Sequence, residues 1–371
     1  MIQVLNILTD SNVGGAGRCL INYLKYCDRS RYAVKVVLPR HSALRDEVLE
    51  LGVPVIEADG IAERSFSLGA IGTLKRIIRA EKPDIVHTHG SLSGRIAARQ
   101  CHAKVIYTRH SAFPVPGYLK KGPGHVLNGA LNSHYADAVI AVSPATAQNL
   151  MDSGVPKKKI TVMMNGVEPL QRSTEAQCRD MRQRLGVPEG VFTAGILARL
   201  EPYKGHMLLL DAAEELMDEG REFRILIGGS GSAEADILSG IQSRGLTEKV
   251  LFLGFVERVS EILSILDVQL NCSYGTEASS ISLIEGMSLG LATVASDYGG
   301  NPWQVEDGVT GLLFESGSSR GLAQCLRRLM DDPAALARMG RDARKTYETR
   351  FTGEIFAKHI EAVYSQTMQR K

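Results

Sequence analysis

The sequence predicts two α/β domains, each a doubly wound parallel sheet with helices on both faces. Short segments that are apolar almost throughout alternate with segments of helical periodicity, which is typical of β-α-β units in a buried parallel sheet. The alternation pauses once, in the polar stretch 165–190, and then resumes. A chain of 371 residues is also too long for one ordinary hydrophobic core. Two domains joined near residues 165–171 are therefore expected.

The first half of the chain carries seven segments with the composition of buried strands. They are residues 2–8, 32–38, 54–58, 84–89, 104–109, 137–143 and 160–165. Between them, the helices that cover the sheet are predicted at 15–27, 42–52, 70–81 and 94–103.

The second half repeats this architecture without repeating the sequence. Strands are predicted at 192–200, 223–229, 250–255, 268–273 and 292–296, each followed by a helix. Ligands of such sheets bind beyond the carboxyl ends of the strands. We therefore expect the functional residues in the loops that follow the strands, in a cleft shared by the two domains.

Composition narrows the class of protein. The chain is 44% hydrophobic and 23% charged, which is ordinary for a soluble globular protein. Six cysteines occur without a C-x-x-C pair, which argues against a disulfide framework or a zinc site and for reduced thiols in a cytoplasm. The N-terminal segment is a strand with an early Asp10 rather than a signal peptide, and no apolar run is long enough to cross a bilayer. We expect a cytoplasmic protein, for which peripheral contact with the inner face of a membrane stays open.

The charges are unevenly distributed. Residues 1–165 hold 21 Lys and Arg against 12 Asp and Glu, whereas residues 166–371 hold 22 against 29. Between Ile85 and Ala136 there is no acidic residue, and this stretch holds six of the nine histidines. Such a stretch is either a solvated face or a surface that meets something anionic, such as a phosphorylated acceptor or an acidic membrane. Few aromatic residues lie among these charges, so nucleic acid is not expected as a partner.

Two loops carry groups suited to phosphate. Gly14, Gly15 and Gly17 lie between the first strand and the first helix, where backbone amides attract anions, although a tight turn explains these glycines equally well. Their spacing differs from G-x-G-x-x-G, which disfavours a dehydrogenase. In the second half, Arg199 and Lys204 flank a turn before a helix, either as a diphosphate clamp or as two solvated charges.

Two carboxylates follow the predicted strand 268–273. Glu277 lies in the turn, and Glu285 lies within an apolar helical run, where a charge needs a polar partner. The amides of Ala278 to Ile281 would face an anion, and the two carboxylates would accept hydrogen bonds from hydroxyl groups. A phosphate flanked by two polyols, as in a sugar nucleotide, fits this arrangement.

These residues give the chain a resemblance to the retaining glycosyltransferase family 4, the group 1 glycosyltransferases similar to glycogen and sucrose synthases, which have a GT-B fold. The resemblance rests on the E-x7-E pair Glu277/Glu285, the RLxxxKG element at 199–205, NGV at 165–167 and GGxxxxVEDGVTGLLF from Gly299. The first half adds GGAGR, PDIVHTH and TRHS. Together these motifs span nearly the whole chain in the order of the family.

The resemblance implies roles for the domains and for single residues. Residues 1–168, joined by the C-terminal helix 354–371, would form the acceptor-side domain, and residues 169–353 the nucleotide-sugar-binding domain. The catalytic residues that it implies are His110, Glu277, Arg199 and Lys204. The residues expected to bind the nucleotide sugar are Gly14, Gly15, Ser230, Phe255, Val256, Ala278, Ser279, Ser280, Ile281 and Glu285. Those expected on the acceptor and membrane side are Arg18, Arg95, Lys120 and Lys121.

By the same resemblance, Arg199 and Lys204 would neutralise the donor diphosphate, and Glu285 would hold the ribose. Glu277 would bind hydroxyls of the transferred sugar, and His110 would lie near the sugar and the acceptor. The family is independent of metal and needs no cofactor, since the nucleotide sugar is a co-substrate. The expected reaction transfers a sugar with retention from a UDP-sugar, favoured over a GDP-sugar, to a hydroxyl of an acceptor in cell-surface polysaccharide or glycolipid synthesis. The expected acceptor is a glycan, a lipid-linked molecule or a small molecule.

The chain departs from the family pattern at two places. IGGSGS stands where family members often have VGDGP, so Ser230 replaces an acid, and ASS follows Glu277 in place of a bulkier segment. The identity of the sugar therefore stays open. One alternative is a sugar-nucleotide epimerase or hydrolase, which would turn over donor without an acceptor. Another is a non-catalytic partner subunit, which would have lost the donor-site residues that are all present here.

Two further features allow more than one interpretation. His87 and His89 alternate along a strand and so point to one face, as a pair of metal ligands would. No nearby carboxylate completes such a site, and no metal is expected. Trp303, the one tryptophan of the sequence, is either a core residue or a lid over the donor.

Overall fold

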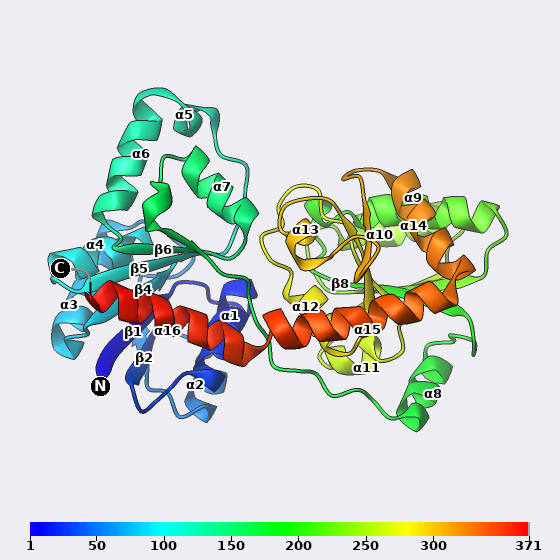
Figure 1. The fold of residues 1–371 in the computed structure, drawn as a ribbon, viewed down its shortest axis with the longest axis horizontal. Coiled ribbons are helices and arrows are strands. Elements are labelled where there is room, and N and C mark those ends of the chain that lie inside the picture. The colour runs from blue at the N-terminus through cyan, green and yellow to red at the C-terminus, as the bar shows by residue number, and fades with distance from the viewer. Residues whose placement is uncertain (370–371) are drawn as a thin grey trace. The chain divides into compact units, whose positions relative to one another are not determined.

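The computed structural model describes residues 1–369 and divides into two compact units (Figure 1). Unit 1 holds Met1–Val167 together with the C-terminal segment from Phe351, and unit 2 holds Glu168–Arg350. The expected boundaries, after residue 168 and before residue 354, differ from these by one and three residues. The last two residues of the predicted C-terminal helix lie outside the described part of the chain.

Unit 1 is built on a seven-stranded sheet in which all neighbouring strands are parallel (Figure 1). The strands are β1 (Ile2–Leu8), β2 (Tyr32–Pro39), β3 (Val55–Ala58), β4 (Ile85–His89), β5 (Lys104–Arg109), β6 (Ala138–Ala141) and β7 (Ile160–Val162). Their order is β3-β2-β1-β4-β5-β6-β7, so the winding reverses between β1 and β4. Each strand overlaps a predicted segment, and the doubly wound arrangement is confirmed.

Helices flank this sheet. They are α1 (Gly15–Tyr26), α2 (Arg45–Glu50), α3 (Leu68–Glu81), α4 (Leu92–Gln100), α5 (Gly117–Lys120), α6 (Gly122–His134), α7 (Pro144–Asp152) and α16 (Gly353–Gln369), with a 3-10 turn at Lys157–Lys159. Ser67, Ser91 and Ser143 cap α3, α4 and α7 by accepting a hydrogen bond from a backbone amide of the first turn. The C-terminal helix α16 packs against α1, where the ring centroids of Tyr23 and Tyr364 lie 5.9 Å apart.

Unit 2 is built on a six-stranded parallel sheet of the same design. Its strands are β8 (Phe192–Leu197), β9 (Phe223–Gly228), β10 (Val250–Gly254), β11 (Val268–Asn271), β12 (Ala292–Ser296) and β13 (Gly311–Phe314). They are ordered β10-β9-β8-β11-β12-β13, with the reversal between β8 and β11. The sequence patterns predicted all of these strands except β13, which lies at the edge of the sheet beside β12.

The helices of unit 2 are α8 (Glu175–Arg184), α9 (His206–Asp218), α10 (Glu234–Ser243), α11 (Val259–Leu263), α12 (Ile281–Ser288), α13 (Asn301–Gln304), α14 (Ser319–Asp331) and α15 (Pro333–Arg350), with a 3-10 turn at Pro202–Lys204. Part of the polar stretch 165–190, for which no helix was predicted, forms α8. Its half-buried Cys178 and Met181 pack against the cluster that contains Ile262 and Leu266. This segment is therefore a structural element of unit 2.

The chain leaves and re-enters unit 1 at neighbouring positions. The Val167 amide donates a hydrogen bond to the Phe351 carbonyl at 3.0 Å, and the Gly353 amide donates to the Val167 carbonyl at 2.9 Å. Gly166 leaves no room for a side chain here, because a Cβ atom would lie 2.3 Å from the Thr352 carbonyl oxygen. Hydrogen bonds thus join the two connections. Within residues 1–369, no helix is long and apolar enough to cross a membrane.

Candidate active site

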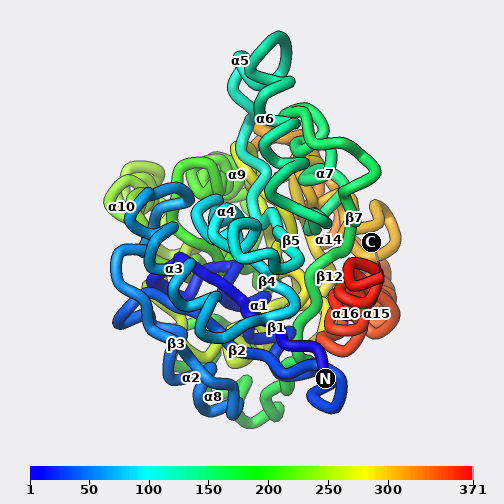
Figure 2. The backbone as a smooth tube through the Cα atoms, turned by 90° about the vertical axis from the view of Figure 1, so that its left-hand side faces the viewer, coloured from blue at the N-terminus to red at the C-terminus, as the bar shows by residue number. Residues whose placement is uncertain are grey.

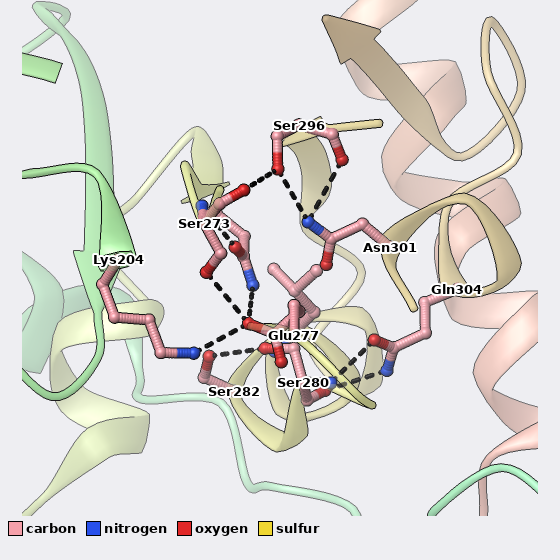
Figure 3. A network of polar contacts seen from close by, with 10 residues as sticks. Lys204, Ser273, Glu277, Ser280, Ser282, Ser296, Asn301 and Gln304 are labelled. Carbon is pink, nitrogen blue, oxygen red and sulfur yellow. Dashed lines mark hydrogen bonds and ion pairs between the residues drawn. The ribbon is translucent and has the colours of Figure 1, made fainter. Parts of the chain in front are cut away.

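The loop after β11 in unit 2 holds a buried carboxylate in a network of hydrogen bonds (Figure 3). Nζ of Lys204 donates to Oε2 of Glu277 at 2.8 Å. The same oxygen accepts hydrogen bonds from Nδ2 of Asn271 at 2.9 Å and from Oγ of Ser273 at 3.0 Å. An unpaired carboxylate would be costly to bury. These three donors therefore explain how the fold holds Glu277 at 5% exposure.

The same network keeps Glu277 ionised. Burial alone would raise the pKa of Glu277, but the Lys204 ammonium and the hydrogen bonds from Lys204, Asn271 and Ser273 outweigh it and hold the pKa below its ordinary value. The Lys204 side chain is 16% exposed. Its ammonium has three N–H donors, of which Glu277 takes one. Lys204 can therefore bind an anion without leaving Glu277.

Neighbouring segments hold the backbone on either side of the start of α12. The Gly300 amide donates to the Glu277 carbonyl at 3.0 Å, and the Ser280 side chain caps α12 by accepting from the Leu283 amide. The Ser280 amide donates to Oε1 of Gln304 at 2.8 Å, and Nε2 of Gln304 donates to the Ser280 carbonyl at 2.9 Å. This corrects one expectation, since Gln304 already occupies the Ser280 amide that was predicted to face an anion. Of the other residues predicted in this loop, Ala278 is buried, and Ser279 and Ile281 are partly exposed.

Five of the predicted nucleotide-sugar and catalytic residues line one open pocket of unit 2. Arg199, Ser230, Phe255 and Val256 come from the loops after β8, β9 and β10, and Glu285 comes from α12. Arg199 is exposed, Phe255 is 72% exposed and Glu285 is partly buried. A guanidinium, a carboxylate and an exposed aromatic ring thus meet at the end of the sheet where doubly wound folds bind ligands.

Two glycines allow the loops of this site to approach one another. Gly205, between Lys204 and α9, has a φ of +76°, and a Cβ atom there would lie 2.1 Å from the Cys272 carbonyl oxygen. Gly229 has a φ of +149°, and a Cβ atom there would lie 1.9 Å from the Ala198 carbonyl oxygen. Side chains other than glycine are therefore excluded at both positions by backbone conformation and by space.

In unit 1, the predicted histidine His110 follows β5 and stacks on His89 at the end of β4. Nε2 of His110 and Nδ1 of His89 are 2.9 Å apart, and the ring centroids are 5.1 Å apart. The His87 and His89 rings stack with their centroids 4.6 Å apart. Burial lowers the pKa of His110 to about 4 and that of His87 to about 3, so both rings are neutral near pH 7. Among residues 1–369, no group of three or more His, Cys, Asp or Glu side chains is arranged to hold a metal ion.

The N-terminus of α1 lies after β1. Gly14 is the N-cap residue and Gly15 is the first residue of α1. Neither glycine has a positive φ, and a Cβ atom on Gly15 would meet no atom within 4 Å. Neither the backbone nor the packing requires glycine at position 15. The space beside this end of α1 is open. Arg18, one turn later, pairs with Glu47 at 3.0 Å on the surface.

The remaining predicted cations of unit 1 differ in exposure. Arg95 is 5% exposed, donates to Oδ1 of Asn132 at 2.7 Å and lies 4.3 Å above the centroid of the Tyr107 ring. The prediction that Arg95 belongs to a surface facing an acceptor or a membrane is wrong, because the ring and the amide hold its guanidinium inside unit 1. Lys120 and Lys121 are exposed where α5 meets α6.

Sequence reasoning missed the residues that hold the predicted ones in place. Asn271 and Ser273 donate to Glu277, and His89 bonds to His110. Each is a polar residue at or just beyond the carboxyl end of an apolar strand, where a parallel sheet faces its ligand. A polar residue at the carboxyl end of a predicted strand was therefore the sequence feature that could have identified these three residues.

Known proteins resemble this chain in sequence. Two family models match the chain, Glycosyltransferase Family 4 over residues 13–170 and Glycosyl transferases group 1 over residues 178–346. The Bacillus subtilis protein EpsD, named as a glycosyltransferase, is 26% identical over 316 residues, with 81% of each chain covered. The D-inositol 3-phosphate glycosyltransferase of Streptomyces avermitilis is 30% identical over 308 residues, which cover 77% of this chain and 66% of that protein. The amylovoran biosynthesis glycosyltransferase AmsK of Erwinia amylovora is 27% identical over 315 residues, with 79% and 75% covered.

Solved structures share the architecture of both units. HepE of Anabaena, in complex with UDP and glucose, matches with a TM-score of 0.84 at 24% identity, covering 99% of this chain and 100% of that one. A glycosyltransferase of Rickettsia africae matches with a TM-score of 0.86 at 21% identity, covering 100% and 99%. At these identities the likeness establishes the fold, which is GT-B. One family model matches the first half of the chain and the other matches the second half. The chain therefore belongs to the group 1, family 4 glycosyltransferases.

Proposed function

We propose that this glycosyltransferase transfers a sugar from a nucleotide diphosphate sugar, with UDP-sugars favoured over GDP-sugars, to a hydroxyl of a glycan or lipid-linked acceptor. The observation that carries the proposal is the unit 2 pocket lined by Arg199, Phe255 and Glu285. HepE, which shares the fold, has been solved with UDP and with UDP-glucose. The name of AmsK refers to amylovoran biosynthesis, which favours cell-surface polysaccharide or glycolipid synthesis as the setting.

The charges of the site suit the two ends of such a donor. Arg199 and Lys204 would bind the diphosphate, the first in bidentate fashion and the second as a point charge. Glu285 would accept hydrogen bonds from the ribose hydroxyls. The three donors around Glu277 converge on Oε2, which leaves Oε1 to accept a hydrogen bond from a hydroxyl of the transferred sugar.

The transfer that we propose proceeds with retention on one face of the sugar. The bond between C1 and the diphosphate oxygen breaks, and the acceptor oxygen bonds to C1 from the same face. The acceptor proton passes to the departing diphosphate. Because negative charge builds on the leaving group, its stabilisation by Arg199 and Lys204 is the main contribution of the protein. The proposal assigns this charge to the protein rather than to a metal, so activity should persist in excess EDTA.

The first test measures binding of UDP, GDP, ADP and their sugar conjugates in the presence of EDTA. Thermal shift and calorimetry detect the binding. We expect one nucleotide family to raise the Tm, by an amount that grows with ligand concentration. Arg199→Ala should weaken that binding at least tenfold. Arg184→Ala is the matched control, because Arg184 pairs with Asp180 on the exposed helix α8. The absence of any shift, or equal losses in the two variants, would remove the donor site.

We also propose that unit 1 contacts an anionic membrane through α5 and the start of α6. This part of the chain projects beyond the sheet in both views (Figures 1 and 2). Tyr118, Val126 and Leu127 are 71%, 68% and 69% exposed there, beside the exposed Lys120 and Lys121. Exposed apolar side chains among basic ones suit a membrane interface, and each cation contributes about 1 kcal/mol near an anionic surface.

Sedimentation with vesicles tests this contact. Wild type should bind vesicles that contain phosphatidylserine and not purely zwitterionic ones, and Lys120→Glu with Lys121→Glu should lower binding at least tenfold. Arg76→Glu with Arg79→Glu makes the same change of charge on the exposed side of α3 and should leave binding within twofold. Equal losses in the two double variants would refute a site at α5 and α6.

A further inference from the structure

Three imidazole rings form a continuous stack inside unit 1. The His87 and His89 rings lie at an interplanar angle of 28°, and the His89 and His110 rings at 20°. His87 and His89 are only 1% and 6% exposed. A buried imidazole needs hydrogen-bond partners for its ring nitrogens. The partners of these rings therefore decide which nitrogen of each ring carries the proton.

The hydrogen bonds around His89 give the stack a direction. Nε2 of His89 lies 3.3 Å from Oδ1 of Asn6. An amide oxygen only accepts, so with the Asn6 amide in this orientation Nε2 of His89 carries a proton and donates it. Burial and the neighbouring histidines hold the pKa of His89 well below its ordinary value, so the ring is neutral and its Nδ1 is bare.

A bare Nδ1 on His89 fixes the proton of His110 in turn. Nε2 of His110 lies 2.9 Å from that nitrogen and must donate to it. His110 is neutral near pH 7, so its own Nδ1 carries a lone pair. Among the residues that the structure describes, His89 is the hydrogen-bond partner of the His110 ring, and this lone pair is left for a ligand.

His87 closes the other end of the stack without touching His110. Its Nε2 lies 2.7 Å from Oγ1 of Thr108 and its Nδ1 lies 2.8 Å from the hydroxyl of Tyr364, which comes from α16. Both partners can donate or accept. His87 is therefore a buried and satisfied imidazole that places no constraint on the tautomer of His110, which makes it a matched control for His89.

We propose that His89 is a positioning residue that fixes His110 as the Nε2–H tautomer, so that Nδ1 of His110 accepts a hydrogen bond from a hydroxyl of the substrate. The assignment rests on the proposed function in one respect, that His110 lies against substrate. It adds a rule of specificity. The substrate group at His110 must be a hydrogen-bond donor, such as a hydroxyl, because a carboxylate or carbonyl oxygen would face the lone pair of Nδ1.

The direct test is the protonation pattern of the histidine rings, which needs no turnover. In ¹⁵N-histidine-labelled protein at pH 7.5, long-range ¹H–¹⁵N correlation should show a protonated Nε2 and a bare Nδ1 for His110. A ¹⁵N–¹⁵N coupling across the hydrogen bond should join Nε2 of His110 to Nδ1 of His89. His89→Phe should abolish the coupling and the exchange-protected Nε2 proton of His110, and His87→Phe should keep that proton. A proton on Nδ1 of His110 in wild type would overturn the proposal.

Turnover provides the second readout. His89→Phe keeps an aromatic ring but loses the acceptor, and should lower kcat about 5- to 10-fold, as expected for one lost hydrogen bond. His89→Asn places its amide oxygen roughly where Nδ1 was and should restore most of kcat. His87→Phe should stay within twofold of wild type. Equal losses in the two Phe variants, or no rescue by Asn, would reduce His89 to a structural role.

The two proposals can fail separately. Wild type that binds no nucleotide refutes the donor site, whatever the tautomer of His110. Wild type that binds and transfers, with the proton of His110 on Nδ1, refutes the role of His89 alone.

Discussion

Replacing Lys204 by methionine tests the ion pair at the centre of the candidate site. The change keeps an unbranched side chain, one atom shorter, but leaves the Glu277 carboxylate buried without its cation (Figure 3). Removing one partner of a buried ion pair costs about 3–5 kcal/mol. Asn271 and Ser273 still donate to Glu277, so we take the lower end, about 3 kcal/mol. For a domain of the size of unit 2, this lowers the Tm by about 6–12 °C.

The loss should depend on pH with a defined sign. In wild type the pKa of Glu277 lies below its ordinary value, so its contribution to stability is present above the unfolded-state pKa and is lost as pH falls through the folded-state pKa. Without Lys204, burial raises that pKa instead, and a neutral Glu277 becomes easier to bury as pH falls. The difference in stability between Lys204→Met and wild type should therefore shrink between pH 8 and pH 5.

Scanning calorimetry of unit 2 unfolding at both pH values measures the effect. The double variant Lys204→Met/Glu277→Gln removes the stranded charge and should recover at least half of the lost stability at pH 8. A single variant as stable as wild type, or a double variant less stable than the single one, would show that Lys204 does not stabilise a buried Glu277 charge. A stability difference that grows on acidification would show the same.

Three further predictions concern other parts of the two units. Gly205→Ala should lower the free energy of unfolding, measured by urea denaturation, by about 3 kcal/mol, since its φ is +76° and a carbonyl oxygen would lie 2.1 Å from the new Cβ. Gly220→Ala is the control and should lower it by about 1 kcal/mol, because Gly220 has a φ of +72° but open space around it. Equal losses in the two variants would contradict the predicted clash with the carbonyl oxygen. Glu285→Ala should weaken UDP binding about tenfold in calorimetry but leave 2′,3′-dideoxy-UDP unaffected, and an equal loss for both ligands would argue against a ribose contact. The pKa values of His87 and His110, about 3 and about 4, lie below 6.5, so unit 1 should lose stability as pH falls from about 6.5 toward 4, by up to about 1.4 kcal/mol per pH unit for each ring. His87→Phe should lower that slope in urea titrations, and an unchanged slope would count against the burial of a neutral imidazole.

The sequence predicted the fold because parallel strands are buried on both faces and stand out as apolar runs. It missed β13, a four-residue strand at the sheet edge, because Gly311–Phe314 is too short to separate from the surrounding loop by composition. It also predicted no helix at the position of α8, because most of that helix is polar and only one side packs on the unit.

The candidate site was predictable in its position and less so in its contacts. Arg199, Glu277 and Glu285 follow strands whose ends could be read from the sequence, and the fold placed them at that edge. The sequence did not show in the same way which polar side chains would be buried. Arg95 lies inside unit 1 because Tyr107 and Asn132 receive it, and those residues are distant in sequence from it. Partners of this kind depend on tertiary packing rather than on local pattern.

The two points where the chain passes between unit 1 and unit 2 are hydrogen-bonded to each other, which bears on how unit 2 could be exchanged. Unit 2 is one uninterrupted segment inserted into unit 1, and the residues that flank it, Val167 and Phe351, are hydrogen-bonded neighbours. Such neighbours lie about 5 Å apart, a gap that one or two residues can bridge. Unit 2 is thus inserted into unit 1 at one place in the chain. We expect that the corresponding segment of a relative could be spliced in between Val167 and Phe351, because these residues already lie side by side without unit 2 between them.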